Sequence, residues 1–76
     1  MVMDIRKVSI GADYKDGAMH YVIGQHVLND SHIIHLILFD EETRSIKIWI
    51  ERGVEVFLWK EFTATLPISI EYNVNI

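Results

Sequence analysis

The side chains suited to acid-base or metal chemistry are four histidines and two groups of carboxylates. His32 and His35 are three positions apart, so in a regular strand they point to opposite faces and cannot share a metal ion. His26 and His35 could meet diagonally on one face, but the absence of cysteine and of a suitably spaced carboxylate disfavours zinc. The carboxylates lie at 40–42 and within the loop 11–17, where solvated turns are a better interpretation than a catalytic pair.

The sequence also lacks the motifs of nucleophilic catalysis and of phosphate binding. It has no Ser-His-Asp arrangement, no nucleophile elbow and no phosphate-cradling glycine motif. We therefore expect no catalytic residues, no metal site and no cofactor. These expectations together indicate that the chain is not an enzyme.

A glycine-bracketed loop offers binding chemistry instead. Residues 11–17 begin and end with glycine and carry Tyr14 and Lys15, and the strand that follows opens near His20 and Tyr21. Backbone amides and Lys15 suit a phosphate, and a tyrosine ring suits stacking on a base. Further rings and cations follow at Arg44, Lys47, Trp49, Arg52, Phe57 and Trp59. The alternative is that these are ordinary core aromatics beside a solvated loop.

The candidate residues are expected to lie on β-strands. The sequence alternates with period two, is dominated by β-branched and aromatic residues, and is interrupted by turn residues about every ten positions. The strands are predicted at 6–10, 18–28, 32–39, 46–51 and 54–59, with a last one opening at Pro67. Residues 60–66 are predicted to form a crossover or a single helical turn. We expect one all-β domain over residues 1–76, built as a small antiparallel sheet of five or six strands.

The middle strands of this sheet are apolar on both faces. A turn at Asn29-Asp30 places residues whose numbers sum to 59 opposite each other, and both faces of that hairpin are rich in aliphatic residues. In 46–51 three isoleucines share one face and Trp49 points to the other, while the face that receives Trp59 depends on a turn register that stays open. The last strand has one apolar face. Since no amphipathic helix can cover the second apolar face, we expect a homo-oligomer packed through sheet faces.

Charge and hydropathy exclude several classes of partner. The formal charge of -4 disfavours DNA and RNA, whose affinity comes mainly from neutralised phosphates. The longest apolar run, 33–39, is interrupted by His35 and is far shorter than the roughly 20 residues that span a bilayer. The charged start is unlike a signal peptide, and without cysteine a disulfide scaffold is excluded. A cytoplasmic protein without membrane insertion is therefore expected.

Two parts of the chain resemble small phage-encoded proteins that trap nucleotide immune signals, of the anti-CBASS and anti-Thoeris type. The first part comprises residues 7–16, 18–21 and 24–25, and the second comprises residues 45–51 and 57–60. The resemblance implies a sponge that binds a cyclic dinucleotide or a cyclic ADP-ribose type signal at a subunit interface and does not cleave it. It would act in the host bacterial cytoplasm and inhibit antiviral signalling.

In this sponge hypothesis each candidate residue has a role suited to its chemistry. The proposed ligand-binding residues are Tyr14, Lys15, His20, Tyr21, Gln25, Arg44, Trp49 and Trp59. The two cations contact phosphates, the aromatic rings stack on bases, and the histidine and glutamine hydrogen-bond to base or ribose. The alternative function is a protein-binding inhibitor or an oligomeric assembly module with no small-molecule ligand.

Overall fold

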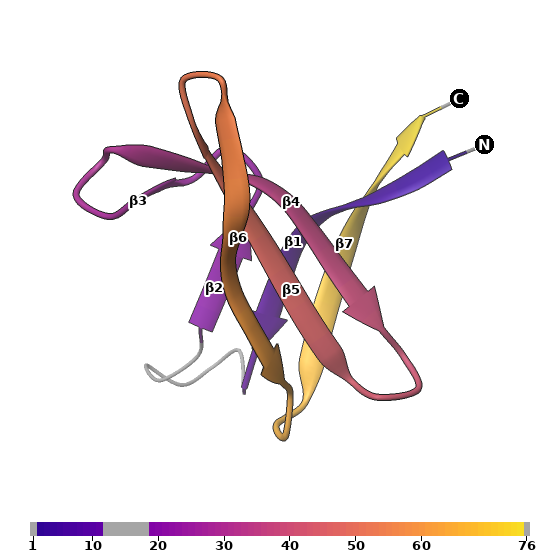
Figure 1. Ribbon diagram of the computed structural model, residues 1–76. Coiled ribbons are helices and arrows are strands. Elements are labelled where there is room, and N and C mark those ends of the chain that lie inside the picture. Colours follow the sequence, from indigo (N-terminus) through magenta and orange to yellow (C-terminus); the bar gives the residue numbers. More distant parts are fainter. Residues whose placement is uncertain (1, 12–18, 76) are drawn as a thin grey trace.

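The computed structural model describes residues 2–11 and 19–75, and these form an all-β fold of two antiparallel sheets (Figure 1). The strands are β1 (Val2–Ile10), β2 (Met19–Val22), β3 (His26–Val27), β4 (His32–Asp40), β5 (Ser45–Arg52), β6 (Glu55–Thr63) and β7 (Ile68–Asn75). The strand order is β2-β1-β7 in one sheet and β3-β4-β5-β6 in the other. The all-β prediction is confirmed, but the described strands number seven and form two sheets. Within the described residues, no helix is long and apolar enough to cross a membrane.

The strand predicted over residues 18–28 is split into β2 and β3, which belong to different sheets. The chain switches sheets at Gly24, whose φ of 89° lies in a region that glycine adopts without strain. Before it, the Ile23 amide donates to the Arg6 carbonyl in β1 at 2.9 Å. From Gly24 onward the partner is β4, because the Gly24 amide donates to the Ile34 carbonyl at 2.9 Å. The extra strand thus comes from one glycine inside an alternating pattern.

The turn predicted at Asn29-Asp30 is confirmed together with its register, since His26 pairs with Ile33 across β3 and β4. A β-bulge at His35 then changes the faces of β4. The predicted alternation placed Ile34 and Ile37 on opposite faces, whereas both are buried in the same core. The face assignment beyond residue 35 was therefore wrong, because a bulge inserts one residue and reverses the parity.

A second bulge lies at Trp59, where the pairing of β5 with β6 shifts between Ile48 and Trp49. After the bulge β6 continues to Thr63, so the crossover or helical turn predicted at 60–66 was wrong for its first residues. Phe62 pairs with the buried Ile46 and packs against the core. The turn register that the sequence left open pairs Arg52 with Glu55, and Trp59 packs partly against the core.

The two sheets form two layers whose strands cross at a large angle, with β4, β5 and β6 in front of β1, β2 and β7 in Figure 1. The core lies between the layers. It consists of the buried Val8, Ile10, Ile34, Ile37, Ile46, Ile48, Ile50 and Ala64. The three isoleucines of β5 are fully buried on one face, as predicted. Burying each of these side chains contributes about 1.5–3 kcal/mol.

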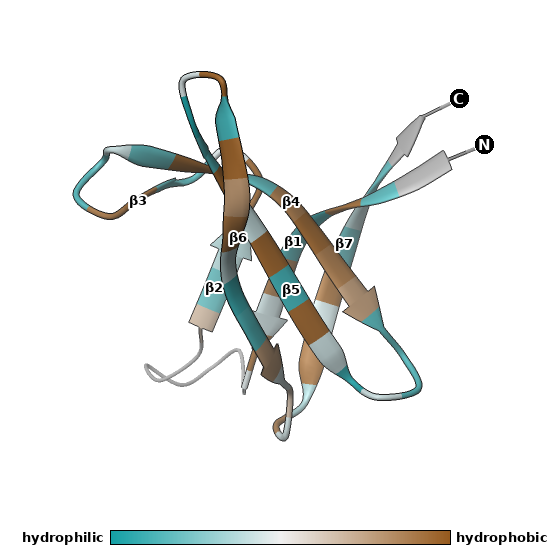
Figure 2. Cartoon of the chain, viewed as in Figure 1, coloured by the Kyte–Doolittle hydropathy of each residue, from teal (hydrophilic) through white to brown (hydrophobic). Residues whose placement is uncertain are grey.

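The outward-facing sides of the two layers differ in polarity. On the three-stranded sheet, Ser9 pairs with His20 on one side and with Ser69 on the other, and Lys7 lies 3.8 Å from Glu71. Hydrophobic residues run along β4, β5 and β6 of the four-stranded sheet (Figure 2), and Leu36, Leu38, Val56 and Leu58 of this sheet are exposed. The excess apolar surface of the middle strands therefore lies on one side of the molecule.

Candidate ligand-binding groove

A groove opens between β2 and β6, which are edge strands of different sheets. It is lined by Met19, Tyr21, Trp59, Lys60, Glu61 and Phe62. It is open to solvent and has a volume of about 400 Å³. The groove thus combines three aromatic rings, a thioether and one charge of each sign.

Tyr21 is the centre of the aromatic part of the groove. Its ring meets the Trp59 ring edge to face, with centroids 6.1 Å apart and an interplanar angle of 80°. The Phe62 ring lies 6.3 Å away at 49°. Both spacings are typical of favourable aromatic pairs. The three rings therefore form a connected apolar wall.

The Tyr21 hydroxyl stays available to a ligand. Burial raises the pKa of the Tyr21 phenol above its ordinary value, so the group is protonated and can donate at neutral pH. In the structure this hydroxyl donates to Met19 Sδ at 3.6 Å, and a thioether is a weak acceptor. A ligand oxygen or nitrogen would be a better partner.

The two charged residues of the groove are held differently. Lys60 Nζ lies 4.8 Å from the centroid of the Trp59 ring, in cation–π geometry. Glu61 Oε2 lies 3.7 Å from Lys47 Nζ on β5. Among the described residues no carboxylate forms an ion pair with Lys60. Lys60 is therefore the cation best placed to meet an anionic ligand.

Two of the predicted binding residues, Tyr21 and Trp59, come together in this groove. Tyr14 and Lys15 lie outside the described residues. His20 is next to Tyr21 on β2 but on the opposite face, with its Nδ1 2.8 Å from Ser9 Oγ. His20 therefore belongs to the polar outer side of the three-stranded sheet.

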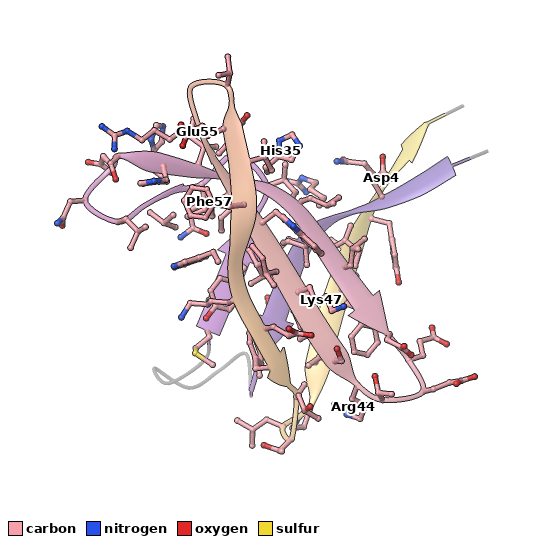
Figure 3. All side chains as sticks on the ribbon, viewed as in Figure 1. Asp4, His35, Arg44, Lys47, Glu55 and Phe57 are labelled. Atoms are coloured by element: carbon pink, nitrogen blue, oxygen red, sulfur yellow. The ribbon has the colours of Figure 1, made fainter. Side chains whose placement is uncertain are left out.

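The other predicted residues do not line the groove. Gln25 Oε1 accepts a hydrogen bond from the Val22 amide at 3.1 Å and so stabilises the turn between β2 and β3. Arg44 donates from Nε to the Ala64 carbonyl at 3.0 Å and from Nη2 to the Leu66 carbonyl at 2.9 Å (Figure 3). Trp49 lies on the outward side of β5, because its neighbours Ile48 and Ile50 are buried.

Four of the described lining residues were not predicted from the sequence as ligand-binding residues, namely Met19, Lys60, Glu61 and Phe62. The prediction of a crossover at 60–66 removed the last three from any sheet. The run from Phe57 to Phe62 is rich in strand formers, and this signal could have extended the strand. The bulge at Trp59 hides that signal, because it breaks the period of two.

The acidic turn at 40–42 has a structural role. Asp40 Oδ1 accepts hydrogen bonds from the Glu42 amide at 2.9 Å and from the Thr43 amide at 3.4 Å, which caps the turn between β4 and β5. A shallow depression of about 730 Å³ lies beside this turn and includes Lys47 in its lining. Its carboxylates do not converge with histidines, and the described residues contain no group of three or more metal-ligating side chains.

Comparisons with models of known families, with curated proteins and with solved structures found no match to this chain.

Proposed function

We propose that this chain binds a small nucleotide in the groove between β2 and β6 and sequesters it without cleaving it. The observation that carries the proposal is the Tyr21–Trp59 ring pair with Lys60 beside it. A nucleotide has a planar base and an anionic phosphate, and these two features match an aromatic wall with an adjacent cation.

The base would stack on the indole of Trp59. Lys60 lies over this ring in the free protein, and its flexible side chain can leave the ring face and contact the phosphate. Stacking of one base on an aromatic side chain contributes about 1–3 kcal/mol. The groove therefore offers base and phosphate contacts from two adjacent residues of β6.

Tyr21 would supply a directional contact. Its protonated hydroxyl can turn from Met19 to an acceptor on the base or the ribose. The sequence places Lys15 four positions before Met19, which lines the groove. We keep Lys15 as a second phosphate contact in the proposal.

The ligand class follows from the resemblance to phage nucleotide sponges. We propose a cyclic dinucleotide or a cyclic ADP-ribose type signal, whose capture would inhibit host antiviral signalling. Among the described residues, Glu61 is the only carboxylate that lines the groove, and it is paired with Lys47. This pairing supports binding rather than acid-base chemistry, and we expect the ligand to be recovered intact.

Calorimetric titration of a panel of cyclic nucleotides into the wild-type chain tests the proposal. Trp59→Ala should weaken binding about 5- to 150-fold, which corresponds to the loss of one stacked base. Phe57→Ala is the matched control, since Phe57 is an exposed aromatic residue of the same strand that does not line the groove. Absence of binding across the panel, or equal losses in both variants, would contradict the proposal.

A second candidate function is a protein-binding inhibitor or an assembly module without a small ligand. The observation that favours it is the apolar outward side of β4, β5 and β6, where Leu36 and Leu58 flank Trp49. For this function, the melting temperature would stay the same across the nucleotide panel while a specific polypeptide binds to that side.

A further inference from the structure

The outward side of the four-stranded sheet is built of three rows of directly paired residues across β4, β5 and β6. Its nine members are Leu38–Lys47–Glu61, then Leu36–Trp49–Leu58, then Ile33–Glu51–Val56. Paired residues share a face of the sheet, and this face is opposite to the buried isoleucines of β5. We call these nine residues the outer face.

The outer face is more apolar than the exposed surface of a typical monomeric protein. Leu36, Leu38, Val56 and Leu58 are 37%, 48%, 48% and 43% exposed. They surround Trp49, which is half-buried at the centre of the middle row. A contiguous apolar patch of this kind marks an interaction site.

Charges lie at the two ends of the outer face. Lys47, paired with Glu61 at 3.7 Å, is at one end of β5, and Glu51 is at the other end beside His35 at 3.5 Å. Figure 3 shows His35 and Lys47 toward opposite ends of the sheet. The face thus has a positive group and a negative group on either side of Trp49.

We propose that two copies of this chain pack through their outer faces, with their β5 strands antiparallel and Lys47 of each copy over Glu51 of the other. The proposal does not depend on nucleotide binding. The two-fold axis of this dimer lies between the outer faces of the two copies, runs perpendicular to the strands and passes over Trp49. It therefore exchanges the two ends of the face. The row with Lys47 then covers the partner's row with Glu51.

The charged residues decide between the two possible face-to-face arrangements. With the axis across the strands, each middle row lies on the same row of the second copy, Leu38 lies over Ile33 of the second copy, and Glu61 lies over its Val56. With the axis along β5, Lys47 would face Lys47 and Glu51 would face Glu51, and Leu38 would face Glu61. Like charges in apposition disfavour that second arrangement.

The size of the outer face sets the strength of the contact. Three rows spaced by about 6.6 Å on three strands spaced by about 4.8 Å cover roughly 20 by 14 Å. Side chains that project from the sheet increase the accessible area, but the contact remains below the standard size of specific interfaces, in the range of weak, transient contacts. We therefore expect a weak dimer that dissociates at micromolar concentrations.

Sedimentation velocity over a range of concentrations tests the dimer and its geometry. The wild-type chain should change from 8.9 kDa to twice that mass as its concentration rises. Lys47→Glu and Glu51→Lys should each weaken the dimer about tenfold or more, because each places like charges together at both symmetric contacts. The double variant should return to within about threefold of the wild type, because it restores opposite charges at both contacts.

The double variant also separates the contact between copies from the pairs within one chain. Each single change removes a pair inside the chain, with Glu61 or with His35, and neither pair is restored in the double variant. If the double variant dimerises more weakly than either single variant, because the two losses in dimer affinity add, the antiparallel arrangement is overturned. A wild-type chain that remains monomeric at all concentrations would overturn the dimer.

Leu58→Glu provides an independent test at the centre of the face, with folding checked by circular dichroism. It should abolish the dimer, whereas Leu66→Glu should not, because Leu66 is also exposed but lies outside the outer face. An unchanged dimer in the folded Leu58→Glu variant would contradict the proposal.

Discussion

Replacing Arg44 separates a structural role from a ligand-binding role. The sequence suggested a phosphate contact, but in the structure the guanidinium group donates from Nε to the Ala64 carbonyl and from Nη2 to the Leu66 carbonyl. The backbone adds a third contact, since the Ala64 amide donates to the Arg44 carbonyl at 2.9 Å. Arg44 therefore ties the turn between β4 and β5 to the connection between β6 and β7. We predict that Arg44→Ala lowers stability and leaves nucleotide affinity unchanged.

The size of this loss follows from the two side-chain hydrogen bonds. The bond to Ala64 is partly buried, and a hydrogen bond from a charged group contributes about 1.5–3 kcal/mol. The bond to Leu66 is exposed and contributes about 0.5–1.5 kcal/mol. A loss of about 2–4 kcal/mol is large against the roughly 4–11 kcal/mol expected for a domain of this length. It should lower the melting temperature by about 8 °C or more.

A glycine variant at the same position distinguishes this explanation from a general surface effect, because it predicts which of the two variants is more stable. Arg44 has a φ of 58°, a region that costs a residue with a Cβ about 1–2 kcal/mol. Arg44→Gly should therefore be about 1 kcal/mol more stable than Arg44→Ala, although alanine is usually the better choice.

Urea denaturation of both Arg44 variants, followed by circular dichroism, measures these differences. Arg52→Ala is the control, because Arg52 is exposed and makes no side-chain hydrogen bond or ion pair to any described residue. An Arg44→Ala variant as stable as the wild type but with weakened nucleotide binding would refute the structural role.

Two further predictions concern the core and the groove. Ile48→Ala should lower the free energy of unfolding by about 2–5 kcal/mol, whereas Leu38→Ala on the outer face should change it by about 0.5 kcal/mol or less, at concentrations where the chain is monomeric. Equal losses in urea denaturation would contradict the assignment of the two faces. Because burial raises the pKa of Tyr21, its contribution to stability is complete below the pKa of an unfolded tyrosine and is lost as the pH rises through the folded pKa. The wild type should therefore lose more stability than Tyr21→Phe in alkaline denaturation, and identical pH profiles would contradict the burial of this phenol.

Local patterns in the sequence were sufficient for much of the fold. The three isoleucines of β5 alternate without interruption, and they are buried together as expected. The polar pair Asn29-Asp30 defined a turn whose register is found in β3 and β4. Both features depend only on residues that are close in the sequence, so the alternation with period two was sufficient to predict them.

The faces beyond the bulges could not be predicted, because a bulge changes the parity of a strand without changing its composition. His35 and Trp59 each add one residue to a strand. The residues after His35 lie on the other face from the one expected, and the residues after Trp59 continue a strand where a crossover or helical turn was expected. Gly24 has a similar effect, since its positive φ redirects the chain from one sheet to the other.

Only part of the candidate site was predicted, because its residues come together through contacts between strands that are far apart in the sequence. Tyr21 and Trp59 were recognised from their chemistry, and their contact depends on two edge strands that the sequence did not place together. Lys60 was assigned to a crossover, although it lines the groove and lies over the Trp59 ring. Arg44 was assigned to a ligand, because its true partners are backbone carbonyls about twenty residues away, which no motif reveals.

Native mass spectrometry of the chain mixed with cyclic nucleotides tests nucleotide capture in the groove. We predict that the wild-type chain retains one nucleotide, that heating releases this nucleotide with its mass unchanged, and that Trp59→Ala retains much less of it while Phe57→Ala retains it fully. A wild-type chain that retains no nucleotide from the panel would contradict binding, and one that releases a linear product after heating would contradict sequestration without cleavage.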